Sequence, residues 1–217
     1  YQGIPVEIHT RLMPPFWGLP EREMIASAQP VHDTDVLATL GPEALLLHAG
    51  THASSSFFSF GLKTGWDFLC VLRSSTAIDW DRLAAWATGM RAPRGFWIPV
   101  RVLGEDLGLP FPAAFLRHVP VDRGARRMTT VARQRLFTST EGIFDLDVIT
   151  KAGIMLLQDS WVGRARYMAT KASWRGGRPA TWGQAASRAR RAYVLRQAWR
   201  QYQRYRRALQ RAAKTYG

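Results

Sequence analysis

Hydrophobic and polar residues alternate at the start of the chain. From Ile4 to Leu12, apolar positions are separated by charged or polar ones. A period of two places the apolar side chains on one face of a strand and Glu7, His9 and Arg11 on the other. The pattern therefore predicts a β-strand whose polar face carries a carboxylate, an imidazole and a guanidinium. An edge strand with a solvated polar face fits the same pattern.

The pattern then changes to a helical period, interrupted by Pro and Gly. We expect Phe16 and Trp17 to hold an irregular stretch against the body, and a short helix from Glu21 to Ala28. Asp79 is a suitable N-cap and Gly108 a suitable helix stop. The further predicted helices cover residues 41–53, 62–73, 80–88, 95–107, 119–142 (exposed) and 143–157.

One strand followed by helices predicts a mainly α fold, with a helical bundle and a long basic C-terminal helix. A single strand cannot satisfy its own backbone hydrogen bonds. We therefore expect its partner strands upstream of Tyr1, which would make the complete protein α+β. We divide the chain into residues 1–35 (strand and irregular excursion), 36–158 (helical bundle) and 159–217 (basic helical extension).

The positive charge is concentrated in the extension. The net charge is +14, and residues 160–217 hold 15 Lys and Arg with no Asp or Glu, whereas residues 1–159 are close to neutral. In the tail, Leu195, Trp199, Tyr202, Tyr205 and Leu209 form an apolar stripe on a predicted helix. The arginines around it are Arg188, Arg191, Arg196, Arg200, Arg204, Arg207 and Arg211. Such a helix fits nucleic acid, an anionic membrane surface, or docking on the body.

Several classes of protein are disfavoured by the sequence. No apolar run approaches the roughly 20 residues that span a bilayer, and no signal peptide opens the chain. Cys70 is the single cysteine and lies in an apolar run, so we expect it in the core and the protein in the cytoplasm. A nucleophile elbow of the Gly-x-Ser-x-Gly type and a Walker loop are both absent.

Two histidines share one face of a predicted helix. His48 and His52 are four residues apart, a spacing that lets two imidazoles bind one metal ion, and Asp67 on the next helix is a candidate third ligand. The alternative is that both are core-edge histidines satisfied by the backbone or by Asp67.

The order of these motifs resembles the uncharacterised nucleotidyltransferase family, a branch of the DNA polymerase β-like nucleotidyltransferase superfamily. The resemblance covers roughly residues 4–115. It rests on Val6-Glu7-Ile8-His9, Gly41-Pro42-Glu43-Ala44-Leu45-Leu46-Leu47-His48-x-x-x-His52, Gly61-Leu62-Lys63-x-x-Trp66-Asp67, Ile78-Asp79-Trp80-Asp81-Arg82-Leu83 and Leu109-Pro110-Phe111-Pro112.

The resemblance implies Mg²⁺-dependent transfer of a nucleotide from an NTP to an acceptor. It implies that Glu7 is the third carboxylate of the superfamily, a catalytic residue that binds metal or takes the proton from the acceptor. It also implies that His9 is catalytic and contacts phosphate or the acceptor. Arg11, His48, His52 and Asp67 are then candidate nucleotide-binding residues. Nucleotidyl transfer needs several carboxylates because divalent ions must neutralise the triphosphate and activate the attacking hydroxyl.

This sequence departs from the superfamily in one respect. The Gly-Ser turn and Asp-x-Asp strand that should precede Glu7 are missing, and Asp145-Leu146-Asp147 lies too late in the chain to replace them. We therefore expect two of the three metal carboxylates upstream, in a longer enzyme. The alternative is a non-catalytic helical module that binds nucleic acid or an acidic partner through its arginine-rich helix.

Overall fold

The computed structural model describes residues 12–14, 16–31, 38–56, 58, 62–75, 77–137, 153–158 and 160–174 of the chain. These residues are mainly helical, which confirms the predicted fold class. The strand predicted at 4–12 lies outside them, apart from Leu12 in a bend, as do most of the helix predicted at 143–157 and the tail after residue 174. In order, the elements are α1 (Glu21–Ala26), β1 (Gln29–Pro30), β2 (Ala38–Thr39), α2 (Pro42–Ser55), α3 (Lys63–Ser74), α4 (Trp80–Gly89), α5 (Arg94–Leu107), α6 (Ala113–Leu116), α7 (Arg123–Phe137) and α9 (Trp161–Trp174).

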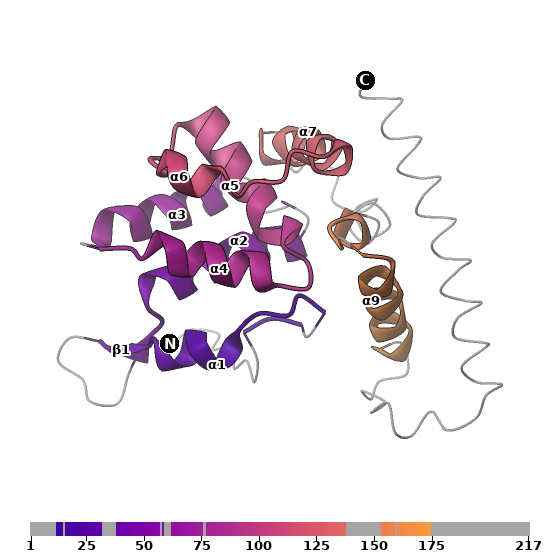
Figure 1. Ribbon diagram of the computed structural model, residues 1–217, viewed down its shortest axis with the longest axis horizontal. Coiled ribbons are helices and arrows are strands. Elements are labelled where there is room, and N and C mark those ends of the chain that lie inside the picture. Colours follow the sequence, from indigo (N-terminus) through magenta and orange to yellow (C-terminus); the bar gives the residue numbers. More distant parts are fainter. Residues whose placement is uncertain are drawn as a thin grey trace, which may run out of the picture.

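Helix α2 is the centre of the bundle (Figure 1). It packs against α1, α3, α4 and α5, while α7 packs on α5 and α6 on α4. Leu46 and Leu47 of α2, Phe68 of α3 and Phe96 of α5 are completely buried. The apolar stripes of the predicted helices thus meet in one core, which supplies the main stabilising term of the fold.

Helix α5 continues through a proline because a neighbouring helix supplies the missing hydrogen bond. Pro99 has no N–H, so the carbonyl of Gly95 lacks its usual helical donor. The hydroxyl of the buried Ser54, on α2, donates to the Gly95 oxygen at 2.6 Å. The proline therefore leaves no orphaned carbonyl, and the same bond fixes α2 against α5.

The N-terminal segment is held against the bundle by two aromatic residues, as predicted. Trp17 is completely buried and lies so close to α5 that a Cβ added at Gly95 would overlap its ring. Phe16 packs edge-on against Tyr167 of α9, with 5.1 Å between ring centroids. The segment therefore links α5 and α9.

The predicted helix boundaries agree with the structure where capping chemistry is clear. The Asp79 side chain accepts the Arg82 N–H and begins α4, and Gly108 ends α5 in the left-handed conformation with a φ of 63°. The antiparallel pair β1–β2 was not predicted. Its strands have only two exposed residues each, too few for a period of two to stand out.

The expectation that Cys70 lies in the core is wrong, because its side chain is exposed. The apolar run around it lies on helix α3, where a turn of 3.6 residues sends neighbouring side chains to different faces. Phe68 points into the core, whereas Cys70 and Trp66 lie on the outer face, with Trp66 64% exposed.

The helix predicted at 119–142 is observed as α7, but it is not exposed on all sides. Ala125, Met128 and Ala132 are buried in the bundle. These residues recur at spacings of three and four, so they form one stripe that packs on α5. The stripe was not predicted because several arginines interrupt it along the sequence.

Candidate functional site

The two candidate histidines lie together on α2. The rings of His48 and His52 are stacked, with 5.7 Å between centroids and 15° between planes. This geometry follows from their four-residue spacing, which places both side chains on one face of the helix. His52 is exposed and His48 is half-buried.

His48 also contacts the segment that follows the predicted strand. Its Nε2 lies 3.2 Å from the backbone oxygen of Leu12. A carbonyl oxygen only accepts, so His48 donates a proton from Nε2 in this bond. The contact places the helix that carries both histidines next to Leu12, one residue after Arg11 and five after Glu7. Glu7, His9 and Arg11 themselves lie outside the described residues.

Asp67 does not join the histidines in a metal site. Its carboxylate pairs with Lys63 one turn earlier on α3, at 2.7 Å, in a solvent-exposed ion pair. Within the described part of the chain, no group of three or more His, Cys, Asp or Glu residues is arranged to hold a metal ion. The nucleotide-binding roles of His48, His52 and Asp67 stay predictions.

A buried carboxylate beside this region was not singled out by the sequence. Glu43, in the first turn of α2, is 2% exposed, and its Oε1 accepts the backbone N–H of Asp79 at 2.7 Å. Its Oε2 lies 2.7 Å from Nη2 of Arg82, whose guanidinium also lies over the ring of Trp86. Glu43 thus joins the starts of α2 and α4. No role for Glu43 could be predicted from the sequence, because a partner 36 residues away leaves no local signal.

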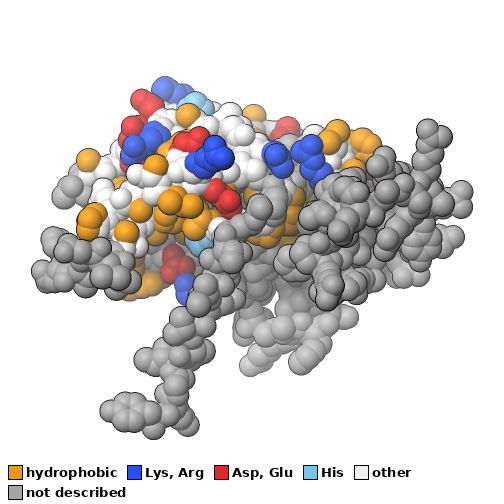
Figure 2. Space-filling model, turned by 90° about the horizontal axis from the view of Figure 1, so that it is seen from below, with side chains coloured by type: hydrophobic (Ala, Val, Ile, Leu, Met, Phe, Trp, Pro, Cys, Tyr) orange, Lys and Arg blue, Asp and Glu red, His pale blue; other side chains and the backbone are white. Residues whose placement is uncertain are grey.

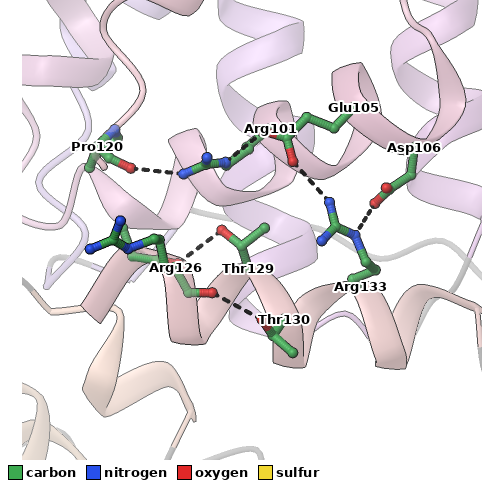
Figure 3. Close-up of polar contacts among 9 residues, drawn as sticks. Arg101, Glu105, Asp106, Pro120, Arg126, Thr129, Thr130 and Arg133 are labelled. Atoms are coloured by element: carbon green, nitrogen blue, oxygen red, sulfur yellow. Dashed lines mark hydrogen bonds and ion pairs between the residues drawn. The ribbon is translucent and has the colours of Figure 1, made fainter. Parts of the chain in front are cut away.

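A second charged network joins α5 to α7 (Figure 3). Arg133 contacts Glu105 at 2.9 Å and Asp106 at 2.5 Å, and Arg101 contacts the other oxygen of Glu105 at 2.8 Å. The hydrogen bond that Arg133 donates to Asp106 raises the pKa of Arg133 against the opposing effect of burial. Arg133 therefore stays charged and paired with Glu105 and Asp106, and its role is to fix α7 on α5.

The start of α7 is organised by Asp122. Its Oδ1 accepts the backbone N–H groups of Gly124 and Ala125, at 2.8 and 3.1 Å, and lies 2.9 Å from Arg94 on α5. Burial alone would raise the pKa of Asp122, but the amides of Ala125 and Gly124 and the charge of Arg94 lower it below its ordinary value. The carboxylate is thus ionised, as expected at a helix N-terminus.

The comparisons with known proteins assign the N-terminal half of the chain. The model of a family described as "Uncharacterised nucleotidyltransferase" matches residues 1–105. The chain is thus similar to that family over these residues, which contain the predicted strand, both histidines, Glu43 and most of α5. The match confirms the resemblance seen in the sequence, and nucleotidyltransferases in general take an NTP and a divalent metal.

Two other comparisons add no relative, since neither a curated protein nor a solved structure matches the chain. In the part of the chain that the structure describes, no helix is both long and apolar enough to cross a membrane.

Proposed function

We propose that the protein is a nucleotidyltransferase that uses Mg²⁺ to transfer a nucleotide from an NTP to an acceptor. The observation that carries the proposal is the family match over residues 1–105. A divalent ion bound with the triphosphate would neutralise its charge and favour attack by the acceptor.

In this proposal Glu7 contributes a carboxylate to the metal site, and His9, on the same face of the predicted strand, contacts phosphate or the acceptor. Mg²⁺ prefers oxygen ligands, whereas imidazole suits zinc and other transition metals. We therefore assign Glu7 to the metal and the imidazoles of His48 and His52 to contacts with the nucleotide. The hydrogen bond from His48 to the Leu12 oxygen supports this assignment, because it holds α2 next to the segment that follows Glu7.

Nucleotide binding to the native protein tests the proposal. Each NTP is titrated by calorimetry with and without Mg²⁺, for the wild type, Glu7→Gln, His52→Ala and the control His118→Ala. His118 is an exposed histidine on the loop after α6, stacked on Trp97, and the proposal gives it no role.

We expect Glu7→Gln to abolish the Mg²⁺-dependent part of NTP binding, His52→Ala to weaken it, and His118→Ala to leave it unchanged. Mg²⁺-dependent binding that persists at wild-type affinity in Glu7→Gln would remove Glu7 from the metal site. Absence of any NTP binding by the wild type would refute the transferase assignment.

A further inference from the structure

Two sets of arginines on α4, α5 and α7 differ in their carboxylate contacts. Arg82, Arg94, Arg101 and Arg133 each lie within 2.9 Å of a carboxylate on another residue. Arg123, Arg126 and Arg127 are exposed, and none of the three has a carboxylate partner among the residues that the structure describes. The paired group stabilises the fold, whereas the second group has no structural role of this kind.

Arg123, Arg126 and Arg127 form a single surface, which we call the α7 arginine face. Residues three and four apart lie next to one another on a helix, so Arg123, Arg126 and Arg127 share the side opposite the buried Ala125, Met128 and Ala132. Figure 3 shows the side chain of Arg126 extending away from the network that ties down Arg133. The whole face is fixed in place because Asp122 caps the helix and Arg133 anchors it to α5.

The α7 arginine face carries charge of one sign. In the view of Figure 2, blue and red side chains lie near one another among hydrophobic ones. On the α7 arginine face, three positively charged residues fall within the five residues 123–127, and these five include no Asp or Glu. Like charges at this spacing repel one another, so the arrangement opposes helix formation slightly and indicates an anionic partner.

We propose that the α7 arginine face binds the phosphate backbone of a nucleic acid. Guanidinium groups match phosphate geometry through paired hydrogen bonds, and a row of them releases the counterions that surround a nucleic-acid strand. A membrane-surface helix would need large apolar side chains beside the arginines. None of the large exposed hydrophobic residues in the described part of the chain comes from α7. We expect binding to be independent of the base sequence of the nucleic acid, because phosphate contacts carry no base information.

The inference is independent of the proposed reaction. The face lies on residues 123–127, after the region matched by the family, and it does not involve Glu7 or the histidines. It is also distinct from the arginines of the tail, which follow residue 174.

The test compares two variants of the whole chain that lose the same charge. Arg123→Gln/Arg127→Gln removes two members of the face, and Arg22→Gln/Arg73→Gln removes two exposed arginines on α1 and α3. Both keep the tail, so its contribution is equal in each. Gln forms helix about as well as Arg, and circular dichroism checks that both variants melt like the wild type.

The measurement is fluorescence anisotropy with a labelled oligouridylate of about 20 nucleotides, at salt concentrations between about 50 and about 200 mM. Each phosphate contact contributes about 0.7 to the slope of log affinity against log salt, so loss of two contacts lowers the slope by about 1.4. Raising the salt from about 50 to about 200 mM lowers the affinity of both proteins. We expect the fold-loss of affinity in Arg123→Gln/Arg127→Gln to be about 7 times smaller than in the wild type.

Equal slopes for the two variants would overturn the proposal. Titration with polyglutamate, followed in the same way, distinguishes an acidic protein partner from a nucleic acid. If Arg123→Gln/Arg127→Gln loses affinity for polyglutamate while its RNA binding matches that of the control, the face serves an acidic protein and the proposal fails.

Discussion

The hydrogen bond between Ser54 and Gly95 supports a quantitative prediction about α5. Ser54→Ala removes the only side-chain donor that the described residues give to the Gly95 carbonyl, and Pro99 has no N–H to replace it. The carbonyl is then buried without a partner. Leaving such a group unsatisfied costs about 1–3 kcal/mol, so we expect the free energy of unfolding to fall by about 2 kcal/mol.

A double-mutant cycle isolates this cause from any other effect of the substitution. In a Pro99→Ala background, the amide of residue 99 can donate to Gly95 in the ordinary helical manner. Ser54→Ala should then cost less than about 1 kcal/mol, which gives a coupling energy of at least about 1 kcal/mol. The effect of Pro99→Ala by itself, which includes loss of a buried ring, cancels in the cycle.

Urea unfolding followed by far-UV circular dichroism measures all four proteins. Ser55→Ala is the matched control, because Ser55 is the next residue on α2 and, among the described residues, its hydroxyl bonds to His52 within the same helix. It should change stability by no more than about 0.5 kcal/mol. An equal cost of Ser54→Ala with and without Pro99 would refute the argument.

Three further predictions concern other contacts. Gly95→Ala should destabilise by about 2 kcal/mol because the new methyl overlaps Trp17, whereas Gly89→Ala, with nothing within 4 Å, should be neutral or slightly stabilising in the same urea assay. Arg82→Ala leaves the buried Glu43 with one backbone donor and should cost about 1–3 kcal/mol, while Arg73→Ala on the surface should cost little; equal effects would contradict the pairing. Asp122→Asn keeps a cap oxygen but removes the charge. Because the folded pKa of Asp122 lies below 3.8, its stabilisation is complete above pH 3.8 and is lost as the pH falls through the folded pKa. The difference in melting temperature between wild type and Asp122→Asn should therefore be constant from pH 7 to about 5 and shrink below 3.8, and a difference that does not change with pH would disprove the ionic contribution.

Local chemistry made much of the fold predictable from the sequence. Asp79 and Gly108 ended helices where capping rules place them, and the burial of Trp17 followed from its apolar surface. Pro99 was the exception that the sequence could not explain. Its compensation comes from Ser54, 41 residues from the carbonyl it satisfies, and such distant pairs leave no local pattern.

In the candidate site, too, local features were predictable and contacts between distant residues were not. The four-residue spacing of His48 and His52 predicted that they share a helix face, and the stacked rings confirm it. The buried state of Glu43 and the pairing of Asp67 with Lys63 depend on how α2, α3 and α4 pack, which the charges alone did not show. The roles of Glu7 and His9 came from the resemblance and stay predictions.

The outer face of α3 offers an experimental advantage. Cys70 is the single cysteine of the sequence, and its side chain is exposed. A maleimide dye should therefore attach once to this 217-residue chain, at a known helix, without any engineered substitution. The unmodified protein can thus carry its own spectroscopic probe, with which binding of nucleotides and of RNA can be followed in a single labelled preparation.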